Sequence, residues 1–262
     1  VTDDAGNIAE ATFNVVVEDN TDPVITSTHP DLTIDADADC EATLPDYTSG
    51  VTTTDNCDTE LEITQSPVVG TTISGNSNQI TLIVTDDAGN IAEATFNVVV
   101  EDNTDPVITS THSDQTIDAN VDCEATLPDY TLDVTATDNC DTELEITQSP
   151  VGGTIISGNS NQITLIVTDD AGNISETTFN ISVNDTIAPT ILCNDDRIIN
   201  LQPGNSSYLV VGNEFDPIES NDNCQIQSII NDFNSESTLE GEEFPLGNYS
   251  IIWTAYDFSG NE

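Results

Sequence analysis

The segment ITLIVTDDAGNIAEATFNVVV (residues 80–100) carries the clearest structural pattern of the chain: two β-branched runs joined by an Asp/Gly/Asn turn. Such a pattern is typical of a β-hairpin. In the second run Phe96, Val98 and Val100 alternate with polar residues, so one face is buried and the other faces water. Further strand candidates are residues 24–28, 32–35, 40–45, 60–66 and 70–74. About seven short strands separated by turn signals, with no helical period, predict an immunoglobulin-like β-sandwich.

This hairpin belongs to a tandem repeat. Residues 1–29 recur without a change as residues 84–112, and the same offset of 83 residues separates Cys40 from Cys123 and Cys57 from Cys140. Self-similarity at a fixed period indicates an array of domains. The sequence therefore predicts an all-β chain of tandem immunoglobulin-like β-sandwich domains in an elongated array. The expected parts are the last hairpin of a preceding repeat at 1–19, complete repeats at 20–102 and 103–185, and a divergent third repeat without its last strand at 186–262.

The charge balance restricts the possible functions. The chain has 49 Asp and Glu residues against a single basic residue, Arg197. Such a negative field repels phosphate backbones and anionic lipid headgroups, which excludes nucleic-acid binding and makes direct membrane insertion unexpected. Apolar residues make up 36% of the chain and follow a pattern, unlike those of disordered acidic tracts. Two interpretations of the acidity stay open: solubility in a salty medium, and binding of divalent cations by carboxylates that have no basic partner.

The six cysteines predict disulfides and an oxidising, extracellular compartment. Cys40 and Cys57 are 17 residues apart, as are Cys123 and Cys140. A recurring thiol pair in small units of this composition predicts one disulfide within each unit, Cys40 with Cys57 and Cys123 with Cys140. In the third repeat, either Cys193 bonds Cys224 or each has a partner beyond residue 262. Zinc is a poor alternative, because no histidine lies near these pairs.

The order of these motifs resembles a known family. An Asp-x-x-x-Pro linker, a cysteine opening a strand, TDNC some 17 residues later and then VTDDAGN are similar to the hyalin repeat (HYR) domain, in the variety abundant in large secreted and surface proteins of Bacteroidota. The resemblance covers residues 20–262 and implies an immunoglobulin-related sandwich with roles in adhesion and surface display. Family members often carry four cysteines, two of them on the first and last strands. The first two repeats lack that outer pair, which supports the inner pairing.

Three acidic positions persist even in the divergent repeat: one in the linker, one in the TDNC loop and one in the hairpin turn. In a sandwich these segments are expected at the end where the chain enters, where converging oxygen ligands suit Ca2+. The alternative is that Asp and Asn simply cap turns there. The predicted calcium ligands are Asp19, Asp22, Asp55 and Asp86 at the first junction, Asp102, Asp105, Asp138 and Asp169 at the second, and Asp185, Asp222 and Asp257 at the third. Because Ala188 replaces the second linker aspartate, the third site is expected to be weaker or empty. The acidic run at residues 35–39 lacks the glycine and distal glutamate of an EF-hand and is a weak candidate.

No catalytic motif is present. The chain lacks GxSxG, HExxH and a phosphate-binding glycine loop, and its two histidines, His29 and His112, are expected to be solvated. Aromatic residues make up only 5% of the chain, Trp253 is expected in the core, and Tyr47 with its equivalent Tyr130 is a candidate for exposure.

We therefore expect a non-enzymatic, calcium-stiffened stalk of a secreted or cell-surface repeat protein. Its expected partners are neighbouring repeats of the chain and surface glycans or other surface proteins. Two alternatives are spacer or carbohydrate-binding repeats of a secreted multidomain hydrolase, and a eukaryotic matrix protein. If the source is a bacterium of the resembled kind, Thr186 in the sequence Asp-Thr-Ile is a candidate for O-glycosylation; the alternative is an ordinary linker threonine.

Overall fold

The computed structural model describes all 262 residues, which form two compact units. Unit 1 contains Val1–Asp105 together with two loops of the second repeat, Asp138–Thr142 and Asp169–Asn173. Unit 2 contains Pro106–Thr137, Glu143–Thr168 and Ile174–Glu262. The only helix is the three-residue 3-10 turn η1 (Thr131–Asp133). No helix is therefore long and apolar enough to cross a membrane.

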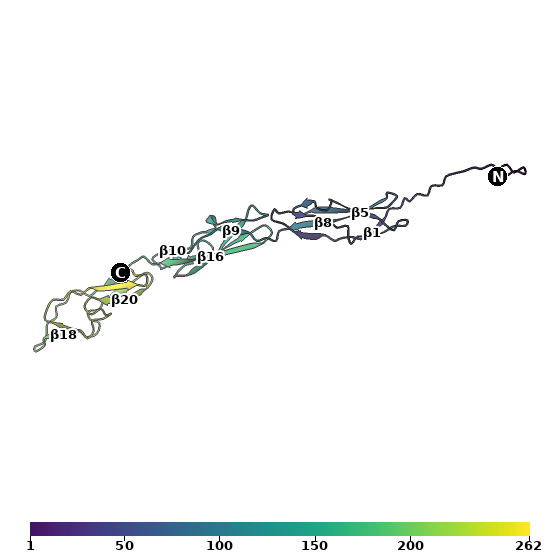
Figure 1. Cartoon of the computed structure of the whole chain (residues 1–262). Helices are drawn as coiled ribbons and strands as arrows, with labels where there is room; N and C mark the ends of the chain where they lie inside the picture. Colours follow the sequence, from purple (N-terminus) through teal and green to yellow (C-terminus); the bar gives the residue numbers. More distant parts are fainter. The chain divides into compact units, whose positions relative to one another are not determined.

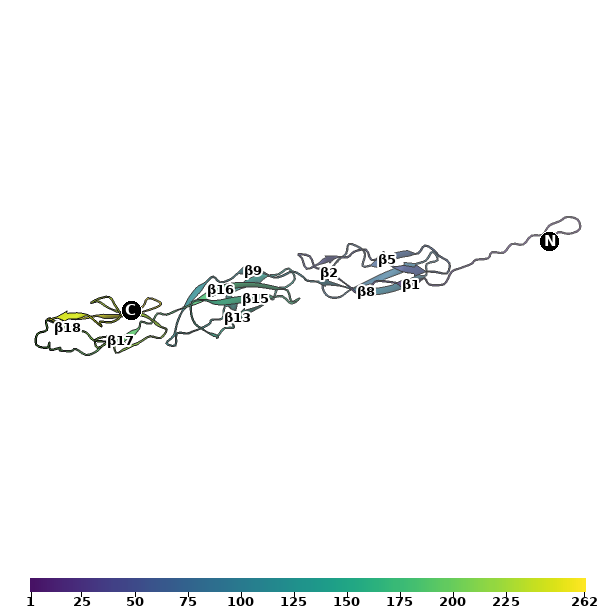
Figure 2. The ribbon, with the colours of Figure 1, turned by 90° about the horizontal axis from the view of Figure 1, so that it is seen from below.

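The main sheet of unit 1 has four strands in the order β2-β8-β7-β5. β2 pairs in parallel with β8, and the other pairs are antiparallel. Two-stranded sheets β1-β4 and β3-β6 complete the sandwich, and the strands lie side by side in both views (Figures 1 and 2). The bounds are β1 (Val24–Ser27), β2 (Leu32–Asp35), β3 (Ala42–Thr43), β4 (Thr52–Thr54), β5 (Glu62–Ser66), β6 (Thr72–Ile73), β7 (Asn78–Thr85) and β8 (Ile91–Glu101).

The predicted hairpin is confirmed and forms the centre of this sheet. β7 and β8 pair along their length, and Leu82 and Val98 are fully buried while alternate residues are more exposed. The turn between them closes with a hydrogen bond from the Asp86 N–H to the Asn90 carbonyl (3.1 Å), and Gly89 takes the positive φ of +90° that the turn requires. Because β8 is 11 residues long and pairs with the whole of β7, its two ends lie at opposite ends of the sheet.

Unit 2 repeats this arrangement in its first half. Its main sheet has the order β10-β16-β15-β13, accompanied by β9-β12 and β11-β14. The third repeat follows with the pairs β17-β19, β18-β21 and β20-β22. The bounds are β9 (Val107–Ser110), β10 (Gln115–Asp118), β11 (Ala125–Thr126), β12 (Thr135–Thr137), β13 (Glu145–Ser149), β14 (Ile155–Ile156), β15 (Asn161–Thr168), β16 (Ile174–Asn184), β17 (Thr190–Leu192), β18 (Ser207–Leu209), β19 (Glu219–Asn221), β20 (Ile226–Asn231), β21 (Glu243–Pro245) and β22 (Trp253–Asp257).

The chain is thus all-β and built of immunoglobulin-like β-sandwiches in tandem. The strand candidates from the sequence did not include β4 and β12, and they gave no indication that β2 runs parallel to β8. Residues 1–19 form only one bridge, between Thr2 and Ile8, and residues 9–18 continue as an exposed, irregular chain up to the half-buried Asp19 (Figure 1). The identical residues 84–102 hold only the end of β7, the turn and β8, and β8 is a full strand there because residues 78–83 of β7 and the strand β2 pair with it.

Four ring side chains, two histidines and two tyrosines, are placed differently from the sequence-based expectation. His29 is half-buried, and its Nε2 lies 2.9 Å from the Tyr47 carbonyl oxygen. Its ring packs against Tyr47 and Phe96, and Tyr47 itself is buried. His112 and Tyr130 repeat these contacts. The expectation that the histidines are solvated and the tyrosines exposed was therefore wrong. Trp253, by contrast, packs in a core with Val210 and Leu239, as predicted.

Candidate functional site: three carboxylate clusters and two disulfides

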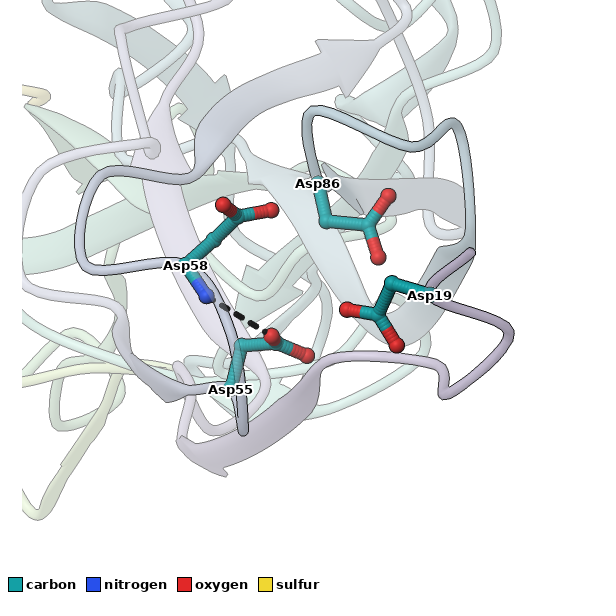
Figure 3. Close-up of side chains that lie close together, drawn as sticks. All are labelled: Asp19, Asp55, Asp58 and Asp86. Atoms are coloured by element: carbon teal, nitrogen blue, oxygen red, sulfur yellow. Dashed lines mark hydrogen bonds between the residues drawn. The ribbon is translucent and has the colours of Figure 1, made fainter. Parts of the chain in front are cut away.

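Aspartates from separate segments meet in unit 1. Asp19 precedes β1, Asp55 and Asp58 lie in the loop between β4 and β5, and Asp86 begins the β7–β8 turn. One carboxylate oxygen of each lies within 4.8 Å of the others. Figure 3 shows the carboxyl groups of Asp19, Asp55 and Asp86 turned toward a common space from three segments of chain.

The same cluster occurs twice more. Asp102, Asp138 and Asp169 form the second, whose residues all belong to unit 1, and Asp185, Asp222 and Asp257 form the third in unit 2. The structure therefore brings together the linker, loop and turn positions that the sequence indicates. Asp22 and Asp105 lie outside the clusters, and Asp58 joins the first one, which no sequence pattern had suggested. The third cluster is complete without an aspartate at Ala188. Thr186, the glycosylation candidate, is exposed beside it.

An asparagine fixes the turn aspartate and ties it to the linker. Asn90 donates from its backbone N–H to Asp86 Oδ1 (2.7 Å) and from Nδ2 to Asp86 Oδ2 (2.6 Å). The same Nδ2 also donates to the backbone carbonyl of Asp19 (3.3 Å). Asn173 and Asn261 repeat both kinds of contact, reaching the carbonyls of Asp102 (3.2 Å) and Asp185 (3.0 Å). The sequence Asp-x-x-Gly-Asn therefore positions the turn carboxylate against the linker in every repeat.

The loop and linker aspartates each use one oxygen locally. Asp55 Oδ2 accepts hydrogen bonds from the N–H groups of Cys57 (2.7 Å) and Asp58 (3.0 Å), which closes the loop as an Asx turn. Asp19 Oδ1 accepts from the Thr21 N–H (3.1 Å). These bonds orient the carboxylates so that the second oxygen of each is directed away from its own turn.

Those second oxygens have no hydrogen-bond partner although they are buried. They are Asp19 Oδ2 and Asp55 Oδ1 in the first cluster, Asp102 Oδ2 and Asp138 Oδ2 in the second, and Asp185 Oδ2 and Asp222 Oδ1 in the third, joined by Asn139 Oδ1 and Asn223 Oδ1. Asp185 is only 5% exposed. A buried, unpaired carboxylate oxygen is costly, and turn capping does not explain it. All these atoms are hard oxygen ligands, so the residues present fit Ca2+.

Two carboxylates of the clusters, Asp19 and Asp257, have a lowered pKa. The Thr21 N–H holds the pKa of Asp19 below its ordinary value, against the opposing effect of burial and with help from Cys57 and Asn56. Burial alone would raise the pKa of Asp257, but hydrogen bonds from Asn261, Gly260 and Ser259 outweigh it and lower the pKa. The single basic residue, Arg197, pairs with Glu214 instead (3.7 Å). No lysine or arginine side chain is therefore available to pair with the carboxylates of the clusters.

The disulfides differ from the sequence-based prediction. Cys40 bonds Cys140, and Cys123 bonds Cys224, with Cα–Cα distances of 4.9 and 4.8 Å. Cys57 and Cys193 are free and exposed. The predicted pairs Cys40 with Cys57 and Cys123 with Cys140 were wrong, and so was a bond between Cys193 and Cys224. Each disulfide instead joins cysteines of consecutive sequence repeats.

The sandwich geometry explains the error. The loop of Cys40 follows β2, whose end pairs with the end of β8 at Glu101. Cys57 lies beside the β7–β8 turn, where β8 begins, because the loop residue Asp58 accepts a hydrogen bond from the Asp87 N–H (3.0 Å). A strand of this length spans roughly 35 Å, whereas bonded cysteines need Cα atoms about 4.4–6.8 Å apart. A spacing of 17 in sequence says nothing about this separation; the parallel β2–β8 pairing decides it.

The thiol of Cys57 lies among the carboxylates of the first cluster. A hydrogen bond to Asp19 raises the pKa of Cys57 above its ordinary value, and burial and the charges of Asp19, Asp55 and Asp58 add to the effect. The thiol is therefore kept protonated in this setting.

The chain is similar to curated relatives along almost its whole length. No protein-family model matches it. It is 30% identical over 270 residues to hyalin of Lytechinus variegatus and 27% identical over 266 residues to hyalin of Strongylocentrotus purpuratus, in each case across 99% of the chain. The chain spans about half the length of the first relative (48%) and 22% of the second. Both relatives come from echinoderms and give no support to a bacterial source.

Among solved structures, the immunoglobulin domains 1–4 of Sidekick-1 align with a TM-score of 0.37 and 14% identity, over 62% of this chain and 48% of that one. A likeness of this size adds nothing to the fold already described. The finding from the comparisons is therefore a similarity in sequence to part of each of two hyalins.

Proposed function

We propose that this chain is part of an extracellular adhesive or structural repeat protein, without enzymatic activity, whose repeat junctions are stiffened by bound Ca2+. The similarity to two hyalins, the two disulfides and the immunoglobulin-like sandwiches support the extracellular and structural part. The partners of such a chain are neighbouring repeats and, at the cell surface, glycans or other proteins.

One observation carries the calcium part: every cluster holds buried carboxylate oxygens that no protein group satisfies. A divalent cation would satisfy them and cancel the repulsion among three or four aspartates. Calcium fits better than zinc, because the clusters consist of aspartates without a histidine, and the one thiol beside them, Cys57, has a raised pKa. It also fits better than magnesium, since ligands from a linker and two loops suit a cation that tolerates flexible geometry.

The position of the clusters gives the cation a mechanical role. In the first cluster Asp19 belongs to the linker segment, whereas Asp55 and Asp86 belong to loops of the folded repeat that follows. A shared cation would hold the linker against the sandwich at that point. With the cation removed, the same carboxylates repel one another over distances shorter than the screening length of about 8 Å at physiological ionic strength. Calcium would therefore restrict the linker, and chelation would release it.

Thermal unfolding in calcium and in chelator tests this proposal. Binding to the folded state alone stabilises it by about 2.7 kcal/mol at a ligand concentration 100 times Kd. We expect millimolar calcium to raise the melting temperature of the chain, followed by circular dichroism, over that in EGTA. The variant Asp19→Asn, which keeps the acceptor for Thr21 but loses charge, should lose part of this shift. The matched variant Asp22→Asn, in the same linker but outside the cluster, should keep all of it.

Two results would count against calcium sites at the junctions. One is a melting temperature that does not respond to calcium or EGTA. The other is an equal loss of the calcium response in Asp19→Asn and Asp22→Asn, because that would indicate general screening of a highly charged chain.

A further inference from the structure

The two disulfides are built from one repeated pair of loops. The first loop, residues 37–41, presents a backbone carbonyl at Asp37 and the thiol of Cys40. The second is the Asn139-Cys140 dipeptide between β12 and β13. Asn139 Nδ2 donates to the Asp37 carbonyl (3.0 Å) while Cys140 bonds Cys40. Asn223 and Cys224 receive residues 120–124 in the same way, with Asn223 Nδ2 donating to the Asn120 carbonyl (3.2 Å).

The presenting loops share one conformation. Asp37 Oδ1 accepts from the N–H groups two and four residues on (2.9 and 3.1 Å), and Asn120 Oδ1 does the same (2.8 and 3.1 Å). The cysteine takes a left-handed φ in both, 58° at Cys40 and 61° at Cys123. Such a φ is uncommon for a residue other than glycine. Because the cysteine has this φ in both copies, we interpret the loop as a defined turn that holds the cysteine side chain in position for the disulfide.

The receiving loop occurs a third time, at Asn56-Cys57. Asp55 Oδ2 closes it with bonds to the Cys57 and Asp58 N–H groups (2.7 and 3.0 Å), as Asp138 Oδ1 does for Cys140 and Asp141 (2.8 and 3.1 Å). Asn56 Nδ2, however, has contacts only with Asp19 Oδ1 (3.4 Å) and Cys57 Sγ (3.1 Å), and Cys57 is free. The Asn56-Cys57 loop therefore has the conformation of its two equivalents. It lacks the partner carbonyl and the partner cysteine that Asn139-Cys140 and Asn223-Cys224 bind.

We propose that Asn56 and Cys57 are the receiving site for the cysteine loop of a further copy of this repeat on the N-terminal side in the same polypeptide, joined through a Cys57 disulfide and an Asn56-to-carbonyl hydrogen bond. This inference does not depend on calcium. Repeats linked in this way would form a continuous covalent ladder, in which each repeat presents one cysteine to the next and receives one from the previous repeat. Cys193 lies on neither kind of loop and takes no part in the ladder.

Formation of the bond requires an oxidant of the disulfide class. The Cys57 thiol and the incoming thiol lose two protons and two electrons as the S–S bond forms. A small disulfide such as oxidised glutathione takes them up by exchange and leaves as two thiols. The direct acceptor of the electrons is therefore the S–S bond of the oxidant.

The repeat itself supplies the experiment. Because residues 1–29 are identical to residues 84–112, adding a copy of residues 20–83 before Val1 completes one more repeat in register. The added copy of Cys40 then precedes Cys57 by 100 residues, the same separation as in the Cys40–Cys140 disulfide. The added copy of Cys57 is replaced by serine to leave one defined pair. Both the original and the extended chain are refolded in a glutathione redox buffer, alkylated without further reductant, and mapped by mass spectrometry.

We expect Cys57 to be alkylated in the original chain. In the extended chain it should be protected, and its peptide should be linked to the peptide of the added Cys40 copy within one molecule. Changing that added Cys40 copy to serine should restore alkylation of Cys57. Alkylated Cys57 in the extended chain would overturn the proposal, and so would a bond from Cys57 to Cys193 or to a second molecule. Intact Cys40–Cys140 and Cys123–Cys224 bonds in the same map show that the chain has folded.

Discussion

The third repeat differs from the second through most of its core, yet the two build nearly the same junction. Trp253 on β22 stands where β15 has Leu165, and Tyr208 and Phe215 pack against the core that Trp253 forms with Val210 and Leu239. At the junction, by contrast, Asp185, Asp222 and Asp257 form the same cluster as Asp102, Asp138 and Asp169. Asn223 and Asn261 also make the bonds of Asn139 and Asn173. A core can be refilled by many apolar side chains, whereas this junction depends on particular oxygen and sulfur atoms.

Among changes at a junction, we expect the largest effect from loss of the Cys123–Cys224 disulfide, which joins the second and third repeats. Replacing both Cys123 and Cys224 by serine opens a loop of about 100 residues, for which chain entropy predicts up to about 4.7 kcal/mol and measured disulfides typically give about 2–4 kcal/mol. The free energy of unfolding of unit 2 should fall by that amount. Urea denaturation followed by the fluorescence of Trp253, the only tryptophan, measures it.

The control for this experiment is Cys193→Ser, because Cys193 is free and exposed. Its urea midpoint should match that of the parent chain. If the double serine variant also unfolded at the parent midpoint, the core rather than the disulfide would dominate the stability of the third repeat.

A smaller effect is expected from the asparagine that ties the turn to the linker. Asn261→Ala removes Nδ2 from the Asp185 carbonyl (3.0 Å) and from Asp257 Oδ2 (2.7 Å). Leaving such acceptors unsatisfied costs about 1–3 kcal/mol. The same Trp253 measurement in chelator should show this loss, while Asn248→Ala, at an exposed position outside the cluster, should show none. Equal midpoints for the two variants would mean that the junction of the third repeat adds no stability of its own.

Most of the fold was predictable from the sequence, because alternating apolar residues in residues 80–100 and an Asp-Gly-Asn turn specify a hairpin locally. The meeting of linker, loop and turn aspartates was predictable too, since the same three positions recur in the divergent repeat. The disulfide pairing was not, because it depends on the parallel β2–β8 pairing, which sends the Cys40 loop to the far end of the sandwich from Cys57. Asp58 was missed because Gln225 stands at its position in the third repeat.

The burial of His29 and Tyr47 was missed for a similar reason. Nothing in their local sequence indicates that Phe96, far along the chain, packs against both rings. Pairs of this kind appear only once the sheets are assembled. Recurrence between repeats shows which residues persist, but it does not show which of them pack against one another in the folded sandwich.

Direct titration with calcium tests the central claim, that the recurring carboxylate clusters are cation sites. Isothermal titration calorimetry of the intact chain should give three bound calcium ions per molecule, one for each cluster. Asp138→Asn and Asp222→Asn should each remove one ion, and Asp105→Asn, outside the clusters, should remove none. Absence of binding at millimolar calcium, or a stoichiometry that the cluster variants leave unchanged, would contradict the account.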